Sequence, residues 1–583
     1  MIGAIRDGNR PRLPIGLALL SALLFALALP NEFFVENPFF MANSWILGIL
    51  APVPLYLALA SAPNWGRAFA LSSLFGATSH ALTSYWLFFY KNFAFWTLGT
   101  TTLAYGIIYG VAGLYGYFAL KSAKPHVRPF HFALAWVSLE YLKSSGFLGY
   151  PWGLLPYSMS ARHLFLQIAD ITGVYGLSWI LAISGALAAE IILYSPTRRF
   201  GILPGFASLS GFPAPMPAKA MRRSSAFVLC AWIGLLLYGV ASMKMEIPLT
   251  ASFSALLVQQ NTDPWIAGEL SALRSNIELA SSTLEDAKAH GKPSPDLIIF
   301  SETSLSRPYA EYRSWFSAHP AEKPLLPFIK ESGSFLLTGA PVVRNWDKWE
   351  VSNSVLLISP EGELLENYAK MHPVPFAEAI PLWEFSWFRE FMQKVVGLEG
   401  GWVMGKEQVV FSIEPKAQGR GLDQEVRFGA PICFEDAFAP LCRDFIRSGA
   451  DILINLTNDS WSKQRSAQYQ HWAIARFRAI ENRRTLVRST NSGVSCVVDP
   501  WGRNILELDQ FRPKAAIFDV PVYKTETPSI YTACGDWFAI FCLALFCRIM
   551  IVNAFLARAT LTAQRSSTPL ELELVPAQED QEG

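Results

Sequence analysis

Residues 426–436 read VRFGAPICFED, an apolar run that reaches Cys433 and is followed by two acidic side chains. Apolar residues at nearly every position are typical of a short strand that is covered on both faces. A free cysteine after such a run is most often a packing residue. With charged groups brought close by the fold, the same cysteine is a nucleophile, and the run alone leaves both interpretations open.

Further runs of this kind lie on both sides of that stretch. Helical stretches separate them, among them Trp265–His290 and Gln468–Arg483. Strands that alternate with helices of this length predict a layered α/β domain of about 280 residues. The runs are FSALLVQQ (253–260), DLIIFSE (296–302), SFLLTGAPVV (334–343), SVLLISP (354–360), DILINLTND (451–459) and GVSCVVDPWG (493–502).

The chain as a whole is too apolar for a soluble protein of its size. Of its 583 residues, 51% are hydrophobic, 16% are charged and 19 are Trp, which predicts membrane-spanning segments. The formal net charge is +1, so no charged field favours nucleic acid, and we exclude it as a partner. The seven cysteines show no paired metal-ligand spacing, so we expect no metal site, no disulfide framework and no cofactor.

Eight hydrophobic runs are long enough to cross the hydrocarbon core of a bilayer. Lys and Arg cluster before the first run and after the second, fourth and sixth, and such loops face the cytoplasm by the positive-inside rule. We therefore predict a seven-helix transmembrane domain at 1–243, an outer α/β domain at 244–533, an eighth transmembrane helix at 534–558 and a disordered cytoplasmic tail at 559–583. The runs are Leu13–Leu29, Ser44–Ala60, Ala68–Tyr90, Phe93–Leu120, Phe130–Phe147, Ile168–Leu193, Ser225–Ala241 and Trp537–Phe555.

Three apolar runs end in a side chain that can take part in covalent catalysis. DLIIFSE ends in Glu302, ELLENYAK ends in Lys370 and VRFGAPIC ends in Cys433. A thiol with a pKa of about 8.5 is only about 3% thiolate at pH 7, so a nucleophilic cysteine needs a base or a positive neighbour. Glu302 can take the proton, and Lys370 can stabilise the thiolate and an oxyanion. Taken singly, a Glu or a Lys at a strand end is more often a solvated surface charge.

The combination resembles a known family. Glu in FSE, Lys in YAKMHPVPFAE and Cys in GAPICFED, in that order, resemble the triad of the nitrilase superfamily, which cleaves carbon–nitrogen bonds through a cysteine thioester and has a four-layer αββα sandwich fold. Seven spans, an outer domain of this type and an eighth span are similar to the apolipoprotein N-acyltransferase family of bacterial inner membranes. Further stretches that agree are GYPWGLLPYS, IADITGVYGLSWIL, LVQQNTDPW, PVPFAEAIP, NLTNDSW, QHWAIARFRAIENRR, RSTNSGVS and YTACGDW.

The resemblance implies roles for five residues near the presumed reaction centre. Glu302 is the expected general base, Lys370 the stabiliser of the oxyanion and the thiolate, and Cys433 the nucleophile. Glu378 in PFAE and Glu435 in CFED match the supporting acids of the family. The fold that follows is an eight-helix membrane bundle with an extramembrane αββα domain.

Aromatic residues are the second feature that the resemblance addresses. Trp265 and Trp461 match positions linked in the family to substrate handling. Phe434 stands where the family often has Tyr, which removes a hydroxyl contact, and SKQRS replaces a Phe-Gly-rich stretch after NDSW. The segment Pro381–Gly405 is dense in Trp and Phe, and we expect it to enter the headgroup zone of a membrane as a lid. The alternative for this segment is an ordinary core helix, because its aromatic residues follow helical spacing.

The implied reaction transfers an acyl chain from a phospholipid to the α-amine of the diacylglyceryl-cysteine of an apolipoprotein, through a thioester on Cys433. The expected partners are these two substrates and the lipid bilayer, and the expected state is a monomer. We expect a location in the bacterial inner membrane, with the outer domain in the periplasm and both termini in the cytoplasm. Two alternatives stay open at this point: a membrane-tethered amidase that uses water as its second substrate, and an inactive scaffold or transporter.

Overall fold

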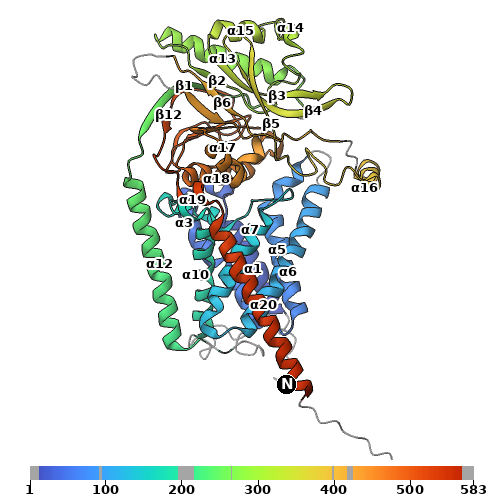
Figure 1. Ribbon diagram of the computed structural model, residues 1–583, viewed down its shortest axis with the longest axis vertical. Helices are drawn as coiled ribbons and strands as arrows, with labels where there is room; N and C mark the ends of the chain where they lie inside the picture. Colours follow the sequence, from blue (N-terminus) through green and yellow to red (C-terminus); the bar gives the residue numbers. More distant parts are fainter. Residues whose placement is uncertain are drawn as a thin grey trace, which may run out of the picture.

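The structure is a computed structural model that describes residues 12–90, 95–194, 214, 216–263, 266–396, 400–416 and 425–566. A bundle of long helices carries a domain built from two β-sheets and their covering helices (Figure 1). The first bundle helices precede the sheets in sequence, and one long helix after the last strand returns to the bundle. This order agrees with the division between an apolar part and an α/β part that the sequence predicts.

The bundle contains nine helices of ten residues or more among the described residues. Five helical segments there are long and apolar enough to cross a membrane, namely Ser44–Ser61, Phe95–Lys121, Tyr175–Leu193, Ala218–Lys244 and Trp537–Phe555. The helices are α1 (Arg12–Ala28), α3 (Pro38–Leu50), α4 (Pro52–Ser61), α5 (Trp65–Thr83), α6 (Thr101–Ser122), α7 (Arg128–Lys143), α10 (Tyr175–Tyr194), α12 (Ala218–Lys244) and α20 (Trp537–Ser566).

The other three predicted spans coincide with shorter or less apolar helices. Helix α1 has 17 residues, and α7 has 16 and carries Glu140 and Lys143 in its second half. Helix α5 ends at Thr83 and is followed by a 3₁₀ helix at Tyr85–Phe89, so this apolar run divides into two elements. Eight membrane crossings therefore stay a prediction.

Helix α20 differs from its predicted boundary. It begins at Trp537, close to the predicted start, but continues to Ser566, past the end that the sequence analysis places at residue 558. The first residues of the expected disordered tail are therefore helical. The rest of that tail, residues 567–583, lies outside the described residues.

Two six-stranded sheets form the centre of the outer domain. Their strand orders are β12-β1-β2-β3-β4-β5 and β11-β10-β9-β8-β7-β6. The pairs β1/β2, β2/β3, β7/β8 and β8/β9 are parallel and the others antiparallel. The strands are β1 (Leu249–Gln259), β2 (Leu297–Ile299), β3 (Phe335–Asn345), β4 (Glu350–Ile358), β5 (Leu364–Ala369), β6 (Val410–Ile413), β7 (Val426–Gly429), β8 (Ile452–Thr457), β9 (Leu486–Thr490), β10 (Cys496–Val498), β11 (Asn504–Glu507) and β12 (Lys514–Tyr523).

The alternating direction of the side chains along β1 explains how the layers of the outer domain pack. Leu256 and Val258 pack in a cluster with side chains of α13 (Ser271–Ala289) and α15 (Leu325–Ser332). Their neighbours Ala255 and Leu257 belong to the core that includes strands of the second sheet. Successive residues of a strand point to opposite faces, so the first sheet is buried on both sides. With α17 (Ala439–Arg447) and α18 (Arg465–Asn482) packed on the second sheet, the domain is the expected αββα sandwich.

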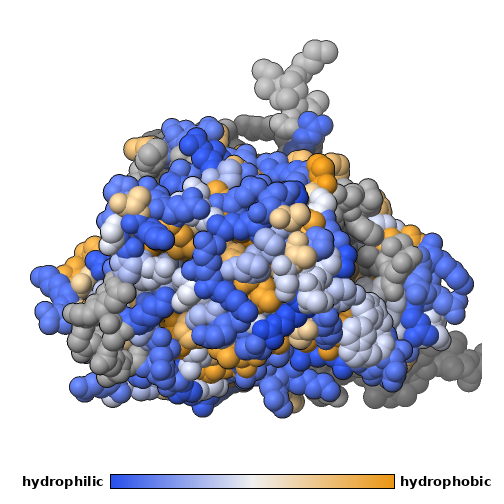
Figure 2. Space-filling view, turned by 90° about the horizontal axis from the view of Figure 1, so that it is seen from above, coloured by the Kyte–Doolittle hydropathy of each residue, from blue (hydrophilic) through white to orange (hydrophobic). Residues whose placement is uncertain are grey.

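Helix α18 fixes the sandwich to the membrane part. Arg476 donates to the carbonyl oxygen of Ser160 at 2.6 Å, and Arg483 donates to Gln167 at 2.6 Å and to Asp170 at 2.8 Å. These arginines are buried, and buried charge-assisted hydrogen bonds resist separation because each lost partner leaves an unpaired charge. The face of the sandwich furthest from the bundle is mostly hydrophilic (Figure 2).

Candidate active site

The fold brings the three predicted catalytic side chains together between the two sheets. Glu302 lies three residues after β2 and Lys370 directly follows β5. The Lys370 Nζ is 3.3 Å from Glu302 Oε1. The charges of both groups act on the Cys433 thiol, and all three side chains are buried. The interpretation of Glu302 and Lys370 as solvated surface charges is therefore wrong, while their catalytic roles stay predictions.

Cys433 does not end a strand, as the sequence suggests. Strand β7 stops at Gly429, and Cys433 opens a 3₁₀ turn that runs to Ala437. Its φ of 49° lies in the left-handed region, which is costly for a side chain with a Cβ and persists only where the surroundings enforce it. Asn455 helps to enforce it, because its Nδ2 donates to the carbonyl oxygens of Pro431 at 3.0 Å and Cys433 at 3.2 Å.

Lys370 also contacts a second carboxylate, that of Glu378. The Nζ lies 2.7 Å from Glu378 Oε2, so Lys370 stands between Glu378 and Glu302. Asn353 Nδ2 donates to Glu302 Oε1 at 2.8 Å and to Glu378 Oε1 at 3.3 Å. The backbone N–H of Asn458 donates to the other Glu302 oxygen at 2.9 Å. These contacts fix both oxygens of Glu302, and they reveal Asn353 and Asn458 as site residues that sequence reasoning missed.

The electrostatics of the cluster favour a neutral thiol and a charged lysine. Burial raises the pKa of Cys433 well above its usual value, the charge of Glu302 raises it further, and Lys370 acts in the opposite direction. Burial lowers the pKa of Lys370, but the charges of Glu302 and Glu378 outweigh it and raise that pKa well above its usual value. The thiol therefore needs a base at the moment of attack, and the Glu302 carboxylate is the candidate whose charge acts most strongly on it.

Glu435 ties the cysteine turn to the lysine loop. Its carboxylate accepts the backbone N–H of Ile432 at 2.7 Å, of Met371 at 2.6 Å and of His372 at 2.9 Å. Tyr368 donates its hydroxyl to the same carboxylate at 3.0 Å. Burial raises the pKa of Glu435 to about 7, against these hydrogen bonds. The predicted supporting role of Glu435 thus has a geometric counterpart, since it joins the residues that flank Lys370 and Cys433.

A buried charge network adjoins the same turn and was not anticipated. His471 Nε2 is 2.8 Å from Asp436 Oδ1, and its Nδ1 is 2.9 Å from Asp459 Oδ1. Arg488 Nη1 lies 2.5 Å from Asp436 Oδ2. Burial lowers the pKa of His471, but the two aspartates raise it to about 9. A charged His471 and Arg488 together balance the two carboxylates. The motif NLTNDSW contains Asp459 and the motif QHWAIARFRAIENRR contains His471. The local sequence around either residue does not show that the two side chains are in contact.

Comparison with known proteins follows the same division of the chain. The family description of the apolipoprotein N-acyltransferase N-terminal domain matches residues 21–187, and that of the carbon-nitrogen hydrolase matches residues 257–527. The protein named apolipoprotein N-acyltransferase 2 of Treponema denticola is 36% identical over 92% of this chain and 96% of its own length. This chain belongs to the apolipoprotein N-acyltransferase family.

Other relatives agree with this placement. Apolipoprotein N-acyltransferase 2 of Treponema pallidum is 34% identical over 95% of this chain and 98% of its own length. The apolipoprotein N-acyltransferase of Borreliella burgdorferi is 30% identical over 90% of this chain and 92% of its own length.

Among solved structures, an amidase from Nesterenkonia sp. is 17% identical, with a TM-score of 0.32, and covers 48% of this chain and 93% of its own length.

Phe434, the departure from the family pattern, packs against the membrane part. Its ring stacks on Trp152 with centroids 5.4 Å apart and an interplanar angle of 16°. Trp152 also lies 5.2 Å from the His471 ring. The main chain of Trp152 is held from inside the bundle, because Lys143 Nζ donates to its carbonyl oxygen at 2.6 Å. A loop of the bundle thus supports the residue next to the nucleophile.

The two predicted tryptophans have different outcomes. Trp461 contacts Trp86 and Tyr90 of the bundle, with ring centroids 5.5 and 5.6 Å apart. Together with Trp86 and Trp152 it lines a cavity of about 20 Å³ that also touches His471. Trp461 therefore lies at the junction of the two parts, which is compatible with substrate handling. Trp265 lies outside the described residues.

The aromatic segment at 381–405 is not a core helix. It contains a six-residue α-helix, α16 (Ser386–Phe391), which continues as a short π-helix at Met392–Val396 and projects from the side of the molecule (Figure 1). Phe385, Trp387 and Phe391 are 49%, 66% and 44% exposed. An exposed aromatic patch of this kind marks an interaction surface rather than packing. Across the described ranges no group of three His, Cys, Asp or Glu side chains is placed to hold a metal ion.

Proposed function

We propose that this protein transfers an acyl chain from a phospholipid to the N-terminal α-amine of the diacylglyceryl-cysteine of apolipoproteins. The observation that carries the proposal is the buried contact of Lys370 with Glu302, beside Cys433, in a chain of this family. A thiol, a carboxylate and a lysine in one buried cluster can form and resolve a thioester. The relatives from Treponema and Borreliella are named apolipoprotein N-acyltransferases.

In the first half-reaction Cys433 is acylated. Its sulfur attacks the ester carbonyl carbon of the phospholipid while the thiol proton passes to the Glu302 carboxylate. The carbonyl oxygen becomes an oxyanion, which the Lys370 ammonium stabilises, a contribution whose loss typically costs about 10² to 10³ in rate. The tetrahedral intermediate then breaks its ester C–O bond, and the departing alkoxide takes the proton from Glu302. A thioester and a lysophospholipid result.

In the second half-reaction the amine of the apolipoprotein replaces water as the nucleophile. Its nitrogen attacks the thioester carbonyl and gives a proton to Glu302, and Lys370 stabilises the second oxyanion. Breaking the C–S bond forms the amide, and the Cys433 thiolate takes the proton back. Glu378 and Glu435 hold Lys370 and the cysteine turn in position, and Trp265, Trp461 and Phe434 are the residues proposed to guide the acyl chains.

The membrane setting fits this pair of substrates, because both carry acyl chains. A site held at the bilayer surface converts their encounter into a search in two dimensions and gains proximity. We propose eight crossings of the bacterial inner membrane, with 1–243 and 534–558 in the bilayer. On this topology the domain at 244–533 is periplasmic, both termini are cytoplasmic, and the protein is a monomer. The exposed aromatic patch around α16 would enter the headgroup zone and keep water from the thioester.

Mass spectrometry of the intact protein after incubation with phospholipid tests the proposal. We expect an acyl adduct on the unaltered protein and on the Cys442→Ala control, which removes another buried cysteine of the same domain. We expect no adduct on Cys433→Ala. An adduct that persists in Cys433→Ala, or that disappears in Cys442→Ala, contradicts the assignment.

A diacylated lipopeptide separates the transferase from an amidase. Added to the acylated protein, the lipopeptide should become triacylated as the adduct disappears, because its amine consumes the thioester. Release of free fatty acid without triacylated product, or of ammonia from an amide substrate, would instead indicate a membrane-tethered hydrolase. Cys433→Ala supplies the background in both assays.

A further inference from the structure

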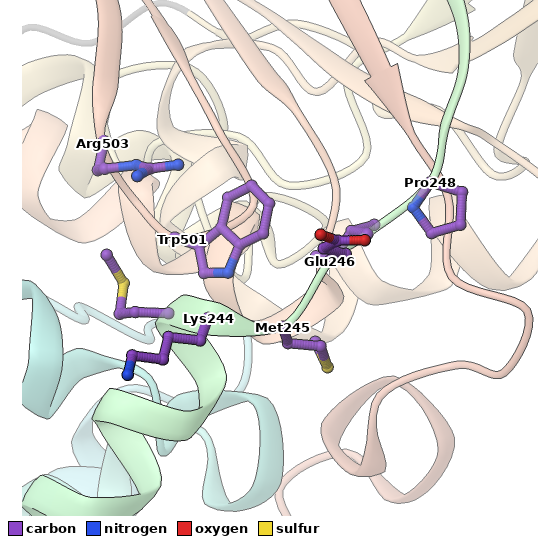
Figure 3. A pocket seen from close by; sticks show the side chains of 8 residues that line it. Lys244, Met245, Glu246, Pro248, Trp501 and Arg503 are labelled. Atoms are coloured by element: carbon purple, nitrogen blue, oxygen red, sulfur yellow. The ribbon is translucent and has the colours of Figure 1, made fainter.

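A larger cavity lies where α12 ends and the outer domain begins. Its volume is about 560 Å³, and it is lined by the linker 243–248, Trp501 and Arg503 (Figure 3). None of the catalytic candidates lines it. Helix α12 stands at one side of the bundle and α16 at the other (Figure 1), so this cavity is separate from the exposed aromatic patch proposed as a lid.

If α12 crosses the membrane as proposed above, the cavity lies at the level where the bilayer changes from hydrocarbon to headgroups. The candidate membrane span Ala218–Lys244 ends at its rim. Only 22% of that span is buried inside the protein, so lipid rather than protein covers most of α12. Trp and Lys residues favour this interfacial depth, where an aromatic ring meets acyl chains and an ammonium meets phosphates. Lipid headgroups are therefore the chemistry that surrounds the opening.

The lining offers one free charge of each sign and a partly engaged guanidinium. Within the described part of the chain, the Lys244 ammonium and the Glu246 carboxylate have no hydrogen-bond or ion-pair partner, and both residues are exposed. Arg503 lies 5.0 Å above the Trp501 ring, and its Nε contacts Asp499 Oδ2 at 2.6 Å. Its Nη groups make no hydrogen bond to the described residues. Figure 3 shows Arg503 and Glu246 on either side of Trp501.

Trp501 forms a fixed floor of the cavity. Trp501 is buried, and its Nε1 donates to the carbonyl oxygen of Ser242 at 2.9 Å. This bond joins the end of α12 to the outer domain and fixes the indole plane. Ligand pockets of about 300 to 1,000 Å³ usually combine aromatic or apolar lining with a few polar groups that fix the orientation of the ligand, and this cavity has both.

We propose that this cavity binds the headgroup of a zwitterionic phospholipid. The phosphate is held by the free Nη groups of Arg503 and by Lys244, whose four-carbon chain points away from Trp501 in Figure 3 and turns toward the headgroup when lipid binds. The headgroup ammonium pairs with Glu246. An anionic headgroup that lacks an amine leaves Glu246 unpaired beside added negative charge, so the site discriminates between lipid classes. The bound lipid lies at the joint between bundle and sandwich, and its binding does not depend on acyl transfer.

Native mass spectrometry of the full-length protein in detergent measures this binding. The Cys433→Ala background prevents consumption of the lipid, and the probes are phosphatidylethanolamine and phosphatidylglycerol. Each removed charge-assisted contact is worth about tenfold in affinity. We therefore expect Lys244→Ala/Arg503→Ala to weaken binding of phosphatidylethanolamine by tenfold or more. Glu246→Gln should narrow the preference for phosphatidylethanolamine over phosphatidylglycerol.

The matched control is Lys348→Ala, which removes an exposed lysine of the β3–β4 hairpin on the outer domain. It should bind lipid as the Cys433→Ala protein does. Equal binding by the double variant and the control overturns the proposal, as does equal affinity for the two lipids before any change at Glu246. If the double variant unfolds, Glu246→Gln alone decides, because an unchanged lipid preference refutes the site. Acylation of Cys433 is measured separately, so failure here leaves the proposed function standing.

Discussion

Replacing His471 by glutamine should make the free energy of unfolding much less dependent on pH in the alkaline range. The pKa of His471 is raised from 6.5 to about 9 because Asp436 and Asp459 flank the buried ring. At about 1.4 kcal/mol for each pH unit, this difference corresponds to about 3 kcal/mol of folding free energy. A raised pKa means that the folded state holds the proton more tightly. The contribution is therefore complete below about pH 6.5 and is lost as the pH rises through about 9.

Equilibrium unfolding in detergent, followed by Trp fluorescence between pH 6 and 10, measures this loss. The unaltered protein and His290→Gln, which changes an exposed histidine directly after α13, should lose about 3 kcal/mol more across that range than His471→Gln. The same pH profile for His471→Gln and His290→Gln refutes the reasoning. His471→Gln also leaves two buried carboxylates with only Arg488, and if it does not fold, Asp459→Asn replaces it. That variant should move the alkaline midpoint to lower pH, because one of the two charges that raise the pKa is gone.

Three further predictions concern acylation of the cysteine, read by the rate of adduct formation. Lys370→Met should slow it about 10² to 10³-fold through loss of the oxyanion donor, and a rate within threefold of normal contradicts that role. Glu302→Gln should slow it about 10² to 10⁴-fold and make the rate rise with pH, because hydroxide must replace the base; an unchanged pH profile argues against a base at this position. Trp152→Ala should cost about 3 to 5 kcal/mol of stability and slow acylation by loosening Phe434, whereas Trp346→Ala, at a position 54% exposed, should change stability by less than about 0.5 kcal/mol.

The expectation that reactive side chains follow strand ends located all three central residues, but it did not predict the backbone conformation of Cys433. Glu302 and Lys370 follow β2 and β5 closely, and local hydrophobic periodicity is enough to find such positions. Cys433 lies four residues beyond β7 in a left-handed conformation. The pattern of an apolar run does not predict that conformation, because contacts from Asn455 in the next strand help to enforce it.

The aromatic segment and the spans show where periodicity misleads. Helical spacing allowed a core helix near Trp387, yet this side chain is 66% exposed, since spacing describes a face but not what covers it. The run at Phe130–Phe147 has the length of a span, but its helix α7 places Glu140 and Lys143 inside the bundle. Lys143 there holds the main chain of Trp152. The role of such a buried charge depends on the group that it contacts, which the local sequence does not show.

By itself, the sequence determined the alternation of apolar runs, the division into a membrane part and an α/β part, and the order of Glu302, Lys370 and Cys433. These properties depend on residues close together in the chain, through backbone periodicity and hydrophobicity. Only the tertiary structure decided that Lys370 is shared by two carboxylates, that His471 is charged, and that a cavity opens beside α12. Burial and the pKa of a group depend on neighbours that are distant in sequence, and only folding brings those neighbours together.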